Sequence, residues 1–168
     1  MHDIHTHIGQ FYQTKYDFHN IFMALKNNGI TETTFAYLTP LFTDSAPAIE
    51  FYNAMTQETK AALDFAKKID LKVNPLYWID PMVLFGGITL ESILNDLDYK
   101  GLVVHPFLND WNPSDEKRAN LLTQIFEFAE KKNYEIYFHT GCSERDNPLI
   151  FEKWFVEYPQ VKVHLAHC

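Results

Sequence analysis

Short β-rich runs alternate with amphipathic segments along the whole chain, and this alternation constrains the fold more than any other feature. Each run is rich in β-branched and aromatic residues, and the segments between runs carry apolar residues at helical spacing. The runs cover residues 3–7, 33–38, 71–78, 101–104, 135–139 and 161–167. Six strands that alternate with five helices indicate consecutive parallel βαβ units, and therefore an α/β fold.

Capping residues delimit several of the helical segments. Asp17 and Gly29 predict the start and the stop of the first helix, and the second runs from about Ala46 to Ile69. The fourth and fifth helices open with Asn112-Pro113 and Asn147-Pro148. Each of these pairs predicts an N-cap followed by proline at the first helical position.

Two α/β architectures fit this order of elements, an open doubly wound sheet and a (β/α)8 TIM barrel. The chain lacks the glycine-rich phosphate loop that often follows the first strand of an open sheet. Its histidines fall at strand ends, where a barrel collects functional side chains, so we predict the barrel. A complete barrel has about 250 residues. With 168 residues, the chain is expected to form an incomplete barrel that lacks the last two strands.

The same length predicts a single domain over residues 1–168. In an incomplete barrel, the first and the sixth strand would each have an unpaired edge. Unpaired edges favour pairing with another chain. We therefore expect a homo-oligomer, or self-association through these edges.

Composition narrows the choice of partners and compartment. The net charge of −8 argues against nucleic acid, because binding to a phosphate backbone favours a basic surface. Charged residues interrupt the apolar stretches, so no membrane span is expected, and the polar start lacks the apolar segment of a signal peptide. Cys142 and Cys168 are too few for a disulfide framework and are expected to be small buried fillers. We expect a cytoplasmic protein whose partner is a small-molecule substrate.

His5-Thr6-His7 lies at the end of the first predicted strand. Side chains at alternate positions of a strand share a face, so Asp3, His5 and His7 are predicted to point the same way. Two neighbouring imidazoles can hold one metal ion, because nitrogen ligands suit zinc and its neighbours. By the same alternation, His2 and His164 should face the helices.

Further histidines end the fourth, fifth and sixth predicted strands, namely His105, His139 and His167. In a barrel they would meet His5 and His7 at one mouth. Taken singly, an inward histidine at a strand end is more commonly a hydrogen-bonded core residue. Several at equivalent strand ends favour a site for one divalent metal ion, with zinc expected first and manganese second.

The loops that follow the strands would surround the mouth with large apolar side chains. Such a rim suits a planar or aromatic acid as substrate, or it covers the open part of an incomplete barrel. Trp78 is the candidate substrate-binding residue among them. The rim comprises Phe11, Tyr12, Tyr16, Leu41, Phe42, Trp78, Met82, Phe85, Phe107 and Trp111.

Charged loop residues are fewer. Arg145 is a candidate to bind a substrate carboxylate through both of its terminal nitrogens. The alternative is a surface ion pair with Glu144 or Asp146. Asp80 and Asp110 have no assigned partner and are expected to be solvated turn formers.

Four segments resemble, in order, motifs of the amidohydrolase superfamily. The resemblance is closest to its amidohydrolase-related (amidohydrolase-2) branch, which includes the decarboxylases similar to aminocarboxymuconate semialdehyde decarboxylase. It covers nearly the whole chain, and the order and spacing of the motifs make it specific. The segments are DIHTHIG at 3–9, KGLVVHP at 100–106, YFHTG at 137–141, and YP at 158–159 followed by VKVHLAH at 161–167.

This resemblance implies a barrel hydrolase in which His5, His7 and His139 bind the metal. His167 would be a further ligand or an acid/base next to the metal. Val103 stands where some relatives with two metals carry a carboxylated lysine, which favours a single metal. The family also has an aspartate at the end of the eighth strand, beyond the chain as given. His167 and His105 are therefore expected to take over proton transfer, with weak catalysis.

Three functions remain open. The first is a metal-dependent hydrolase or non-oxidative decarboxylase of a small carboxylate or cyclic substrate, in which the metal polarises a carbonyl or carboxylate oxygen. The second is a TatD-like nuclease, which also begins with His-x-His but expects a glutamate on the fourth strand, where Val103 and His105 stand. The third is a truncated relative that binds metal without efficient catalysis.

Overall fold

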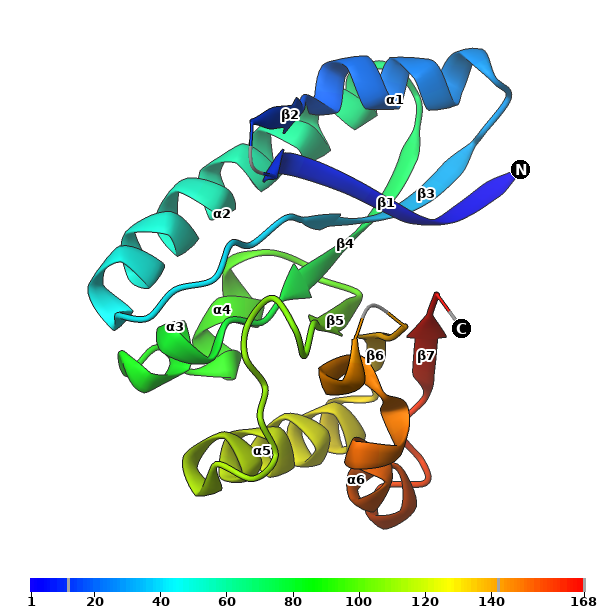
Figure 1. Cartoon of the computed structure of the whole chain (residues 1–168). Helices are drawn as coiled ribbons and strands as arrows, with labels where there is room; N and C mark the ends of the chain where they lie inside the picture. Colours follow the sequence, from blue (N-terminus) through cyan, green and yellow to red (C-terminus); the bar gives the residue numbers. More distant parts are fainter. Residues whose placement is uncertain (12, 142, 168) are drawn as a thin grey trace.

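The structure, a computed structural model, describes residues 1–11, 13–141 and 143–167. Its centre is a seven-stranded sheet in the order β2-β1-β3-β4-β5-β6-β7. Figure 1 shows this sheet as a curved surface with the helices along one side. The strands are β1 (His2–Phe11), β2 (Thr14–Tyr16), β3 (Glu32–Tyr37), β4 (Lys72–Trp78), β5 (Gly101–Val104), β6 (Glu135–His139) and β7 (Val163–Ala166).

Helices connect the consecutive parallel strands. α1 and α2 lie at one end of the curved sheet and α5 and α6 at the other (Figure 1). Two short 3-10 helices precede α6. The helical elements are α1 (Phe18–Asn27), α2 (Ser45–Lys68), α3 (Pro81–Phe85), α4 (Leu90–Asp96), α5 (Glu116–Lys132), η1 (Glu144–Asp146), η2 (Pro148–Phe151) and α6 (Glu152–Glu157).

The strand order distinguishes the two predicted architectures. β1, β3, β4, β5, β6 and β7 are parallel, and each lies beside the next parallel strand in sequence. A doubly wound sheet would instead reverse direction at a switch point. The prediction of consecutive parallel βα units is therefore confirmed. Within the described residues β2 and β7 form the two edges, so the sheet does not close into a barrel.

The two sides of the sheet differ in what covers them. On the helix-facing side, Ile8 and Phe35 pack with Phe22 of α1, and a larger cluster joins Phe138 of β6 to Phe126 of α5. The opposite side, here called the inner face, carries a smaller apolar cluster. It consists of Ala36, Leu38, Leu76, Trp78 and Val103.

The hairpin of β1 and β2 was not predicted from the sequence. β1 continues past the predicted end at His7, and residues 9–11 pair antiparallel with residues 14–16. Gly9 permits this path because its φ is +103° and a Cβ there would lie 2.6 Å from the ring of Tyr37. The first parallel strand is therefore covered by β2 over part of its length, and its edge is less exposed than predicted.

The start of α5 also differs from the prediction. Asp115 is its N-cap, and its carboxylate accepts a hydrogen bond from the backbone N–H of Arg118 at 3.0 Å. Asn112 instead accepts from the N–H of Ser114 at 3.0 Å, which closes a turn before the helix. The other capping predictions hold better, since Asp17 caps α1 and Asn147 caps η2.

In the part of the chain that the structure describes, no helix is both long enough and apolar enough to cross a bilayer.

Candidate active site

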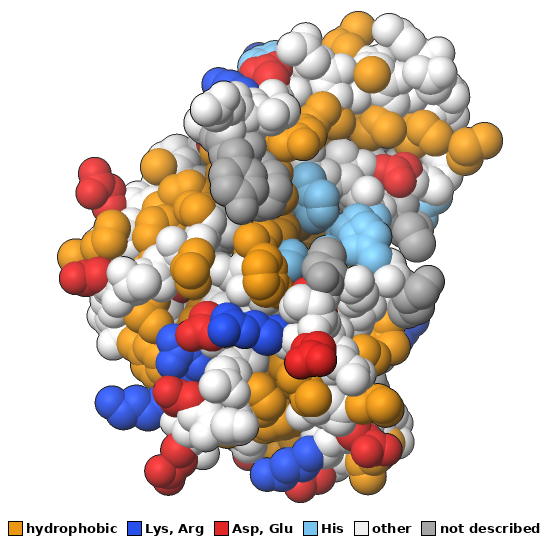
Figure 2. Space-filling model, viewed as in Figure 1, with side chains coloured by type: hydrophobic (Ala, Val, Ile, Leu, Met, Phe, Trp, Pro, Cys, Tyr) orange, Lys and Arg blue, Asp and Glu red, His pale blue; other side chains and the backbone are white. Residues whose placement is uncertain are grey.

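Five imidazoles gather where the parallel strands end at their carboxyl side. We call this group the histidine cluster. The ring centroids of His5 and His7 are 4.5 Å apart, and those of His5 and His167 are 5.7 Å apart. His139 lies 4.8 Å from His167 and 3.7 Å from His105. Figure 2 shows histidine side chains together in a hollow of the surface, so the predicted convergence is seen in the fold.

A bulge in β1 brings His5 and His7 to this face. Between Asp3 and Thr6 the chain of β1 advances by three positions, while the paired β3 advances by only two, from Thr33 to Phe35. The bulge shifts the alternation, so the faces before it differ from those predicted.

Asp3 does not share a face with the histidines. Its carboxylate accepts hydrogen bonds from the hydroxyls of Thr6 and of Thr33, and Thr33 lies on the same face as Phe35, which packs against the helices. His2 approaches Thr34 of the other face, with Nε2 and Oγ1 3.4 Å apart. The predictions for Asp3 and His2 are therefore wrong, because the extra residue inverts the order of faces.

His167 reaches the cluster by a route that the sequence did not indicate. β7 ends at Ala166, and His167 has a left-handed backbone with φ of 63°. His164 lies on the inner face, where its ring stacks on that of Tyr137 and its Nε2 lies 2.7 Å from Oε2 of Glu135. The prediction that His164 faces the helices is wrong, because its neighbour Leu165 pairs with the helix-facing Phe138 and adjacent strand residues face opposite sides.

His105 and His139 stack on each other within the cluster. Their planes are only 15° apart, and Trp78 stacks on the other side of His105 at 5.2 Å. The backbone N–H of Leu108 donates to Nδ1 of His105 at 3.2 Å. Because that nitrogen accepts, the proton of the neutral ring is on Nε2.

The environment of the cluster favours neutral imidazoles. Burial is the main cause, and repulsion between neighbouring rings adds to it. Together they lower the pKa of His7 to about 4, of His105 to about 3 and of His139 to about 4. The pKa of His5 is lowered for the same reasons. A neutral imidazole has a free lone pair, which is the form that binds a metal ion.

The donor chemistry of the cluster fits a divalent cation. Nε2 of His5 and Nδ1 of His7 are buried and have no hydrogen-bond partner among the described residues. Such unpaired buried nitrogens are costly unless a ligand occupies them. In the same described residues, no three His, Cys, Asp or Glu side chains already surround a common point. The donors are therefore present, while the rings are not yet arranged as a complete ligand set.

A small pocket opens directly onto the histidines. It has a volume of about 230 Å³. Trp78 lies in its wall rather than at its rim, since only 3% of its surface is exposed. The pocket is lined by His7, Tyr16, Leu38, Trp78, His105, Leu108 and His139.

A larger apolar cavity of about 630 Å³ adjoins this pocket and shares Leu108 with it. Leu41 and Phe107 line the cavity, as rim residues were expected to do. Trp111 was also expected at the rim but is buried in the helix-facing core. Tyr12 and the side chain of Phe11 lie outside the described residues.

Arg145 also lines the large cavity, and most of its side chain is exposed. Its Nη1 lies 3.5 Å from Oδ1 of Asp110, whereas Asp146 is fully buried. The ion pair that the structure gives Arg145 is therefore with Asp110 rather than with the expected Glu144 or Asp146. Asp110 contacts Arg118 as well, at 3.3 Å, so it bridges two guanidinium groups and is not merely a solvated turn former.

Two buried carboxylates near the cluster were not recognised from the sequence. Asp146 accepts from the N–H of Phe107 at 2.8 Å and lies 4.0 Å from Nδ1 of His105. Asp80 is 1% exposed, caps α3, and has its pKa raised to about 6 by burial. Asp80 directly precedes Pro81 at the start of a helical turn, a pattern typical of solvated caps, whereas Asp146 precedes Asn147, the cap of η2. Their burial depends on contacts with distant loops, so the prediction for Asp80 is wrong.

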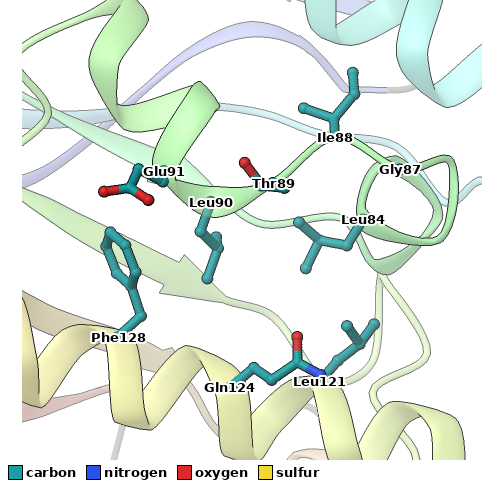
Figure 3. A pocket seen from close by; sticks show the side chains of 9 residues that line it. All are labelled: Leu84, Gly87, Ile88, Thr89, Leu90, Glu91, Leu121, Gln124 and Phe128. Atoms are coloured by element: carbon teal, nitrogen blue, oxygen red, sulfur yellow. The ribbon is translucent and has the colours of Figure 1, made fainter.

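A separate pocket of about 290 Å³ lies between α5 and the α3–α4 connection (Figure 3). Leu84 and Leu90 face Leu121 and Phe128 across it. Of the described residues that line it, only Glu91 is charged, and none is a histidine. It is therefore distinct from the candidate site. Cys142 and Cys168, expected to be buried fillers, lie outside the described residues.

Two crystal structures are similar to this chain in fold. A crystal structure described as amidohydrolase II matches with a TM-score of 0.64 and 15% identity, over 96% of this chain and 65% of that one. A crystal structure of a probable 2-pyrone-4,6-dicarboxylic acid hydrolase from Acinetobacter baumannii, with citric acid bound, matches with a TM-score of 0.52 and 14% identity, over 98% of this chain and 57% of that one.

The chain thus spans less than two thirds of either of these proteins. No protein-family model and no curated protein matches it. At such low identity the likeness shows the fold alone. The likeness extends over nearly the whole of this chain and concerns the arrangement of its parallel strands and helices.

Proposed function

We propose that the chain is a metal-dependent hydrolase of a small carboxylate or cyclic substrate, with one divalent cation at the histidine cluster. Zinc is the preferred ion and manganese the second choice. The observation that carries this proposal is the pair of buried, unpartnered nitrogens on His5 and His7 among imidazoles that burial keeps neutral.

His5, His7 and His139 are the proposed metal ligands. A divalent cation held there supplies Lewis-acid polarisation of a substrate carbonyl and lowers the pKa of water. Neutral ligands leave the positive charge of the cation uncompensated, which attracts an anionic substrate. This is consistent with a carboxylate as the substrate.

His105 and His167 are the proposed catalytic residues, in different roles. With a pKa of about 3, His105 is a poor base near neutral pH, but its Nε2–H can donate a hydrogen bond to a substrate oxygen. His167 is exposed and contacts the rings of His5 and His139. That position suits proton exchange between solvent and the cluster.

The substrate is proposed to lie in the two neighbouring cavities, which share Leu108. Trp78 offers an apolar wall next to the histidines, and Arg145 at the far cavity offers a guanidinium to a carboxylate. Hydrolysis is favoured over decarboxylation because both similar structures bear hydrolase names, one of them for a dicarboxylic acid.

We also propose that the chain self-associates through the unpaired edge of β7. A uniform monomer in light scattering would contradict this proposal.

The test is metal content together with turnover. We expect the purified protein to retain about one zinc per chain, measured by plasma emission, and the His5→Ala/His139→Ala double variant to lose it. His19→Ala, which changes a half-exposed histidine of α1, is the control and should retain the metal. Metal-dependent hydrolysis of cyclic esters that carry a carboxylate would support the activity. Full retention of metal by the double variant would refute the ligand assignment.

A further inference from the structure

A buried polar chain lies directly beneath the histidine cluster. It joins Trp78, the last residue of β4, to Asn109 in the loop after β5 and to Asp80 before α3. Their exposed fractions are 3%, 1% and 1%. A buried polar group is costly unless it has a hydrogen-bond partner, so the contacts among these three residues define how each side chain is oriented.

Only one orientation of the side-chain amide of Asn109 matches the donors and acceptors around it. Its Oδ1 accepts from the indole N–H of Trp78 at 2.6 Å, and its Nδ2 donates to Oδ2 of Asp80 at 2.9 Å and to the carbonyl of Pro40 at 3.3 Å. An indole N–H can only donate and a backbone carbonyl can only accept. Turning the amide over would therefore place donor against donor and acceptor against acceptor. Asn109 thus ties together the segments that follow β3, β4 and β5.

The indole that Asn109 holds is the base of a stack of rings. Trp78 lies parallel to His105 within 18°, and His105 lies parallel to His139 within 15°. Trp78 also contacts His7, with centroids 5.6 Å apart. A rotation of the indole would consequently remove the support of His105 and disturb the side chains of two proposed metal ligands.

We propose that Asn109 is a positioning residue, which sets the planes of His105 and His139 by holding Trp78 in place. The inference rests on the proposed function for its consequence, because the positioned rings matter only if the cluster binds a ligand. The positioning itself is a property of the apo protein. The positioning role of Asn109 can therefore be tested in the absence of metal.

The alternative is that Asn109 merely satisfies buried groups and contributes to stability alone. Trp154 provides a matched control for this alternative. It is equally buried, and its indole N–H donates to Oγ1 of Thr123 at 3.0 Å, but it packs in the helix-facing core. Trp154→Phe and Trp78→Phe thus each remove one buried indole hydrogen bond, and only Trp78→Phe removes one next to histidines.

The experiment measures imidazole resonances in protein labelled with 15N-histidine, free of metal. We expect Asn109→Leu and Trp78→Phe to shift the ring signals of His105 and His139, and Trp154→Phe to leave them in place. Zinc affinity should then fall about tenfold in the first two variants and stay unchanged in the third, the size typical of outer residues that orient metal ligands.

The outcomes separate the two proposals. Unshifted histidine signals in folded Asn109→Leu and Trp78→Phe proteins would overturn the positioning role, whatever the metal content. If Asn109→Leu does not fold, Asn109→Ala decides, because it also removes the acceptor of the Trp78 indole N–H and leaves every ring of the stack unchanged. Shifted signals in a protein that never binds zinc would support the positioning role and count against the proposed function.

Discussion

The imidazole of His105 lies flat against that of His139, with centroids 3.7 Å apart, although His105 follows β5 and His139 is the last residue of β6. Two charged rings at this distance would repel strongly. Burial lowers the pKa of both rings, and repulsion from neighbouring imidazoles adds to it, so the structure favours the neutral form of both. The free energy of unfolding is therefore expected to depend on the protonation of these histidines.

Acid should destabilise the metal-free protein through these histidines. His7, His105 and His139 have folded pKa values of about 4, 3 and 4, below the ordinary 6.5. Between these values the unfolded chain binds more protons, so the free energy of unfolding decreases as the pH falls from 6.5 toward about 4. We expect a loss of at least about 1 kcal/mol over this window, measured by urea denaturation with a chelator present.

Two variants test the source of this pH dependence. His139→Gln should show a shallower decrease, because one of the titrating rings is gone, and His19→Gln on the surface should match the wild type. Asp80 acts in the opposite sense, since its raised pKa of about 6 makes the folded state bind its proton more readily. An identical pH profile for His139→Gln and wild type would contradict the explanation.

Gly141 should be essential for the position of His167. Its φ is +93°, and a Cβ there would lie 2.5 Å from the carbonyl oxygen of His167. Gly141→Ala is therefore expected to cost about 1–2 kcal/mol from backbone strain, plus the displacement of His167. Gly87→Ala is the matched control, because its φ is +90° and nothing lies within 4 Å of the added carbon. Equal losses of thermal stability in the two variants would show that the contact with His167 is unimportant.

Phe138 and Leu165 are register partners on β6 and β7 whose truncation should have very different effects. Phe138 is fully buried against Phe151 and Phe155, whereas Leu165 is 42% exposed. We expect Phe138→Ala to lower the free energy of unfolding by about 3–5 kcal/mol. Leu165→Ala should cost less than about 1 kcal/mol. Comparable urea midpoints for the two variants would contradict the packing of the β6 core.

The beginning of α5 can be tested through its cap. Asp115→Ala removes the acceptor for the N–H of Arg118 and should cost about 1 kcal/mol. Asn112→Ala, at the cap predicted from sequence, removes only a turn hydrogen bond and should cost less. Thermal denaturation of both variants ranks the two positions, and a larger loss for Asn112→Ala would favour a helix that starts earlier.

Much of the fold follows from local patterns. The runs at 101–104 and 135–139 coincide with β5 and β6, and the helix predicted from about Ala46 is α2. Because the carboxyl ends of parallel strands meet at one edge, His5, His105 and His139 could be expected to gather before the structure was known. Alternation and helical spacing are properties of neighbouring residues, so the sequence carries them directly.

What the tertiary structure alone decided is which side chains face which way at the ends of the sheet, and what is buried beneath the site. The bulge in β1 places Asp3 on the helix-facing side and His2 on the inner face. The left-handed backbone of His167 brings its own ring to the histidine cluster. Asn109 and Asp80 acquired their roles only when three loops met. These features depend on pairing and packing between segments far apart in the chain, and no local pattern encodes them.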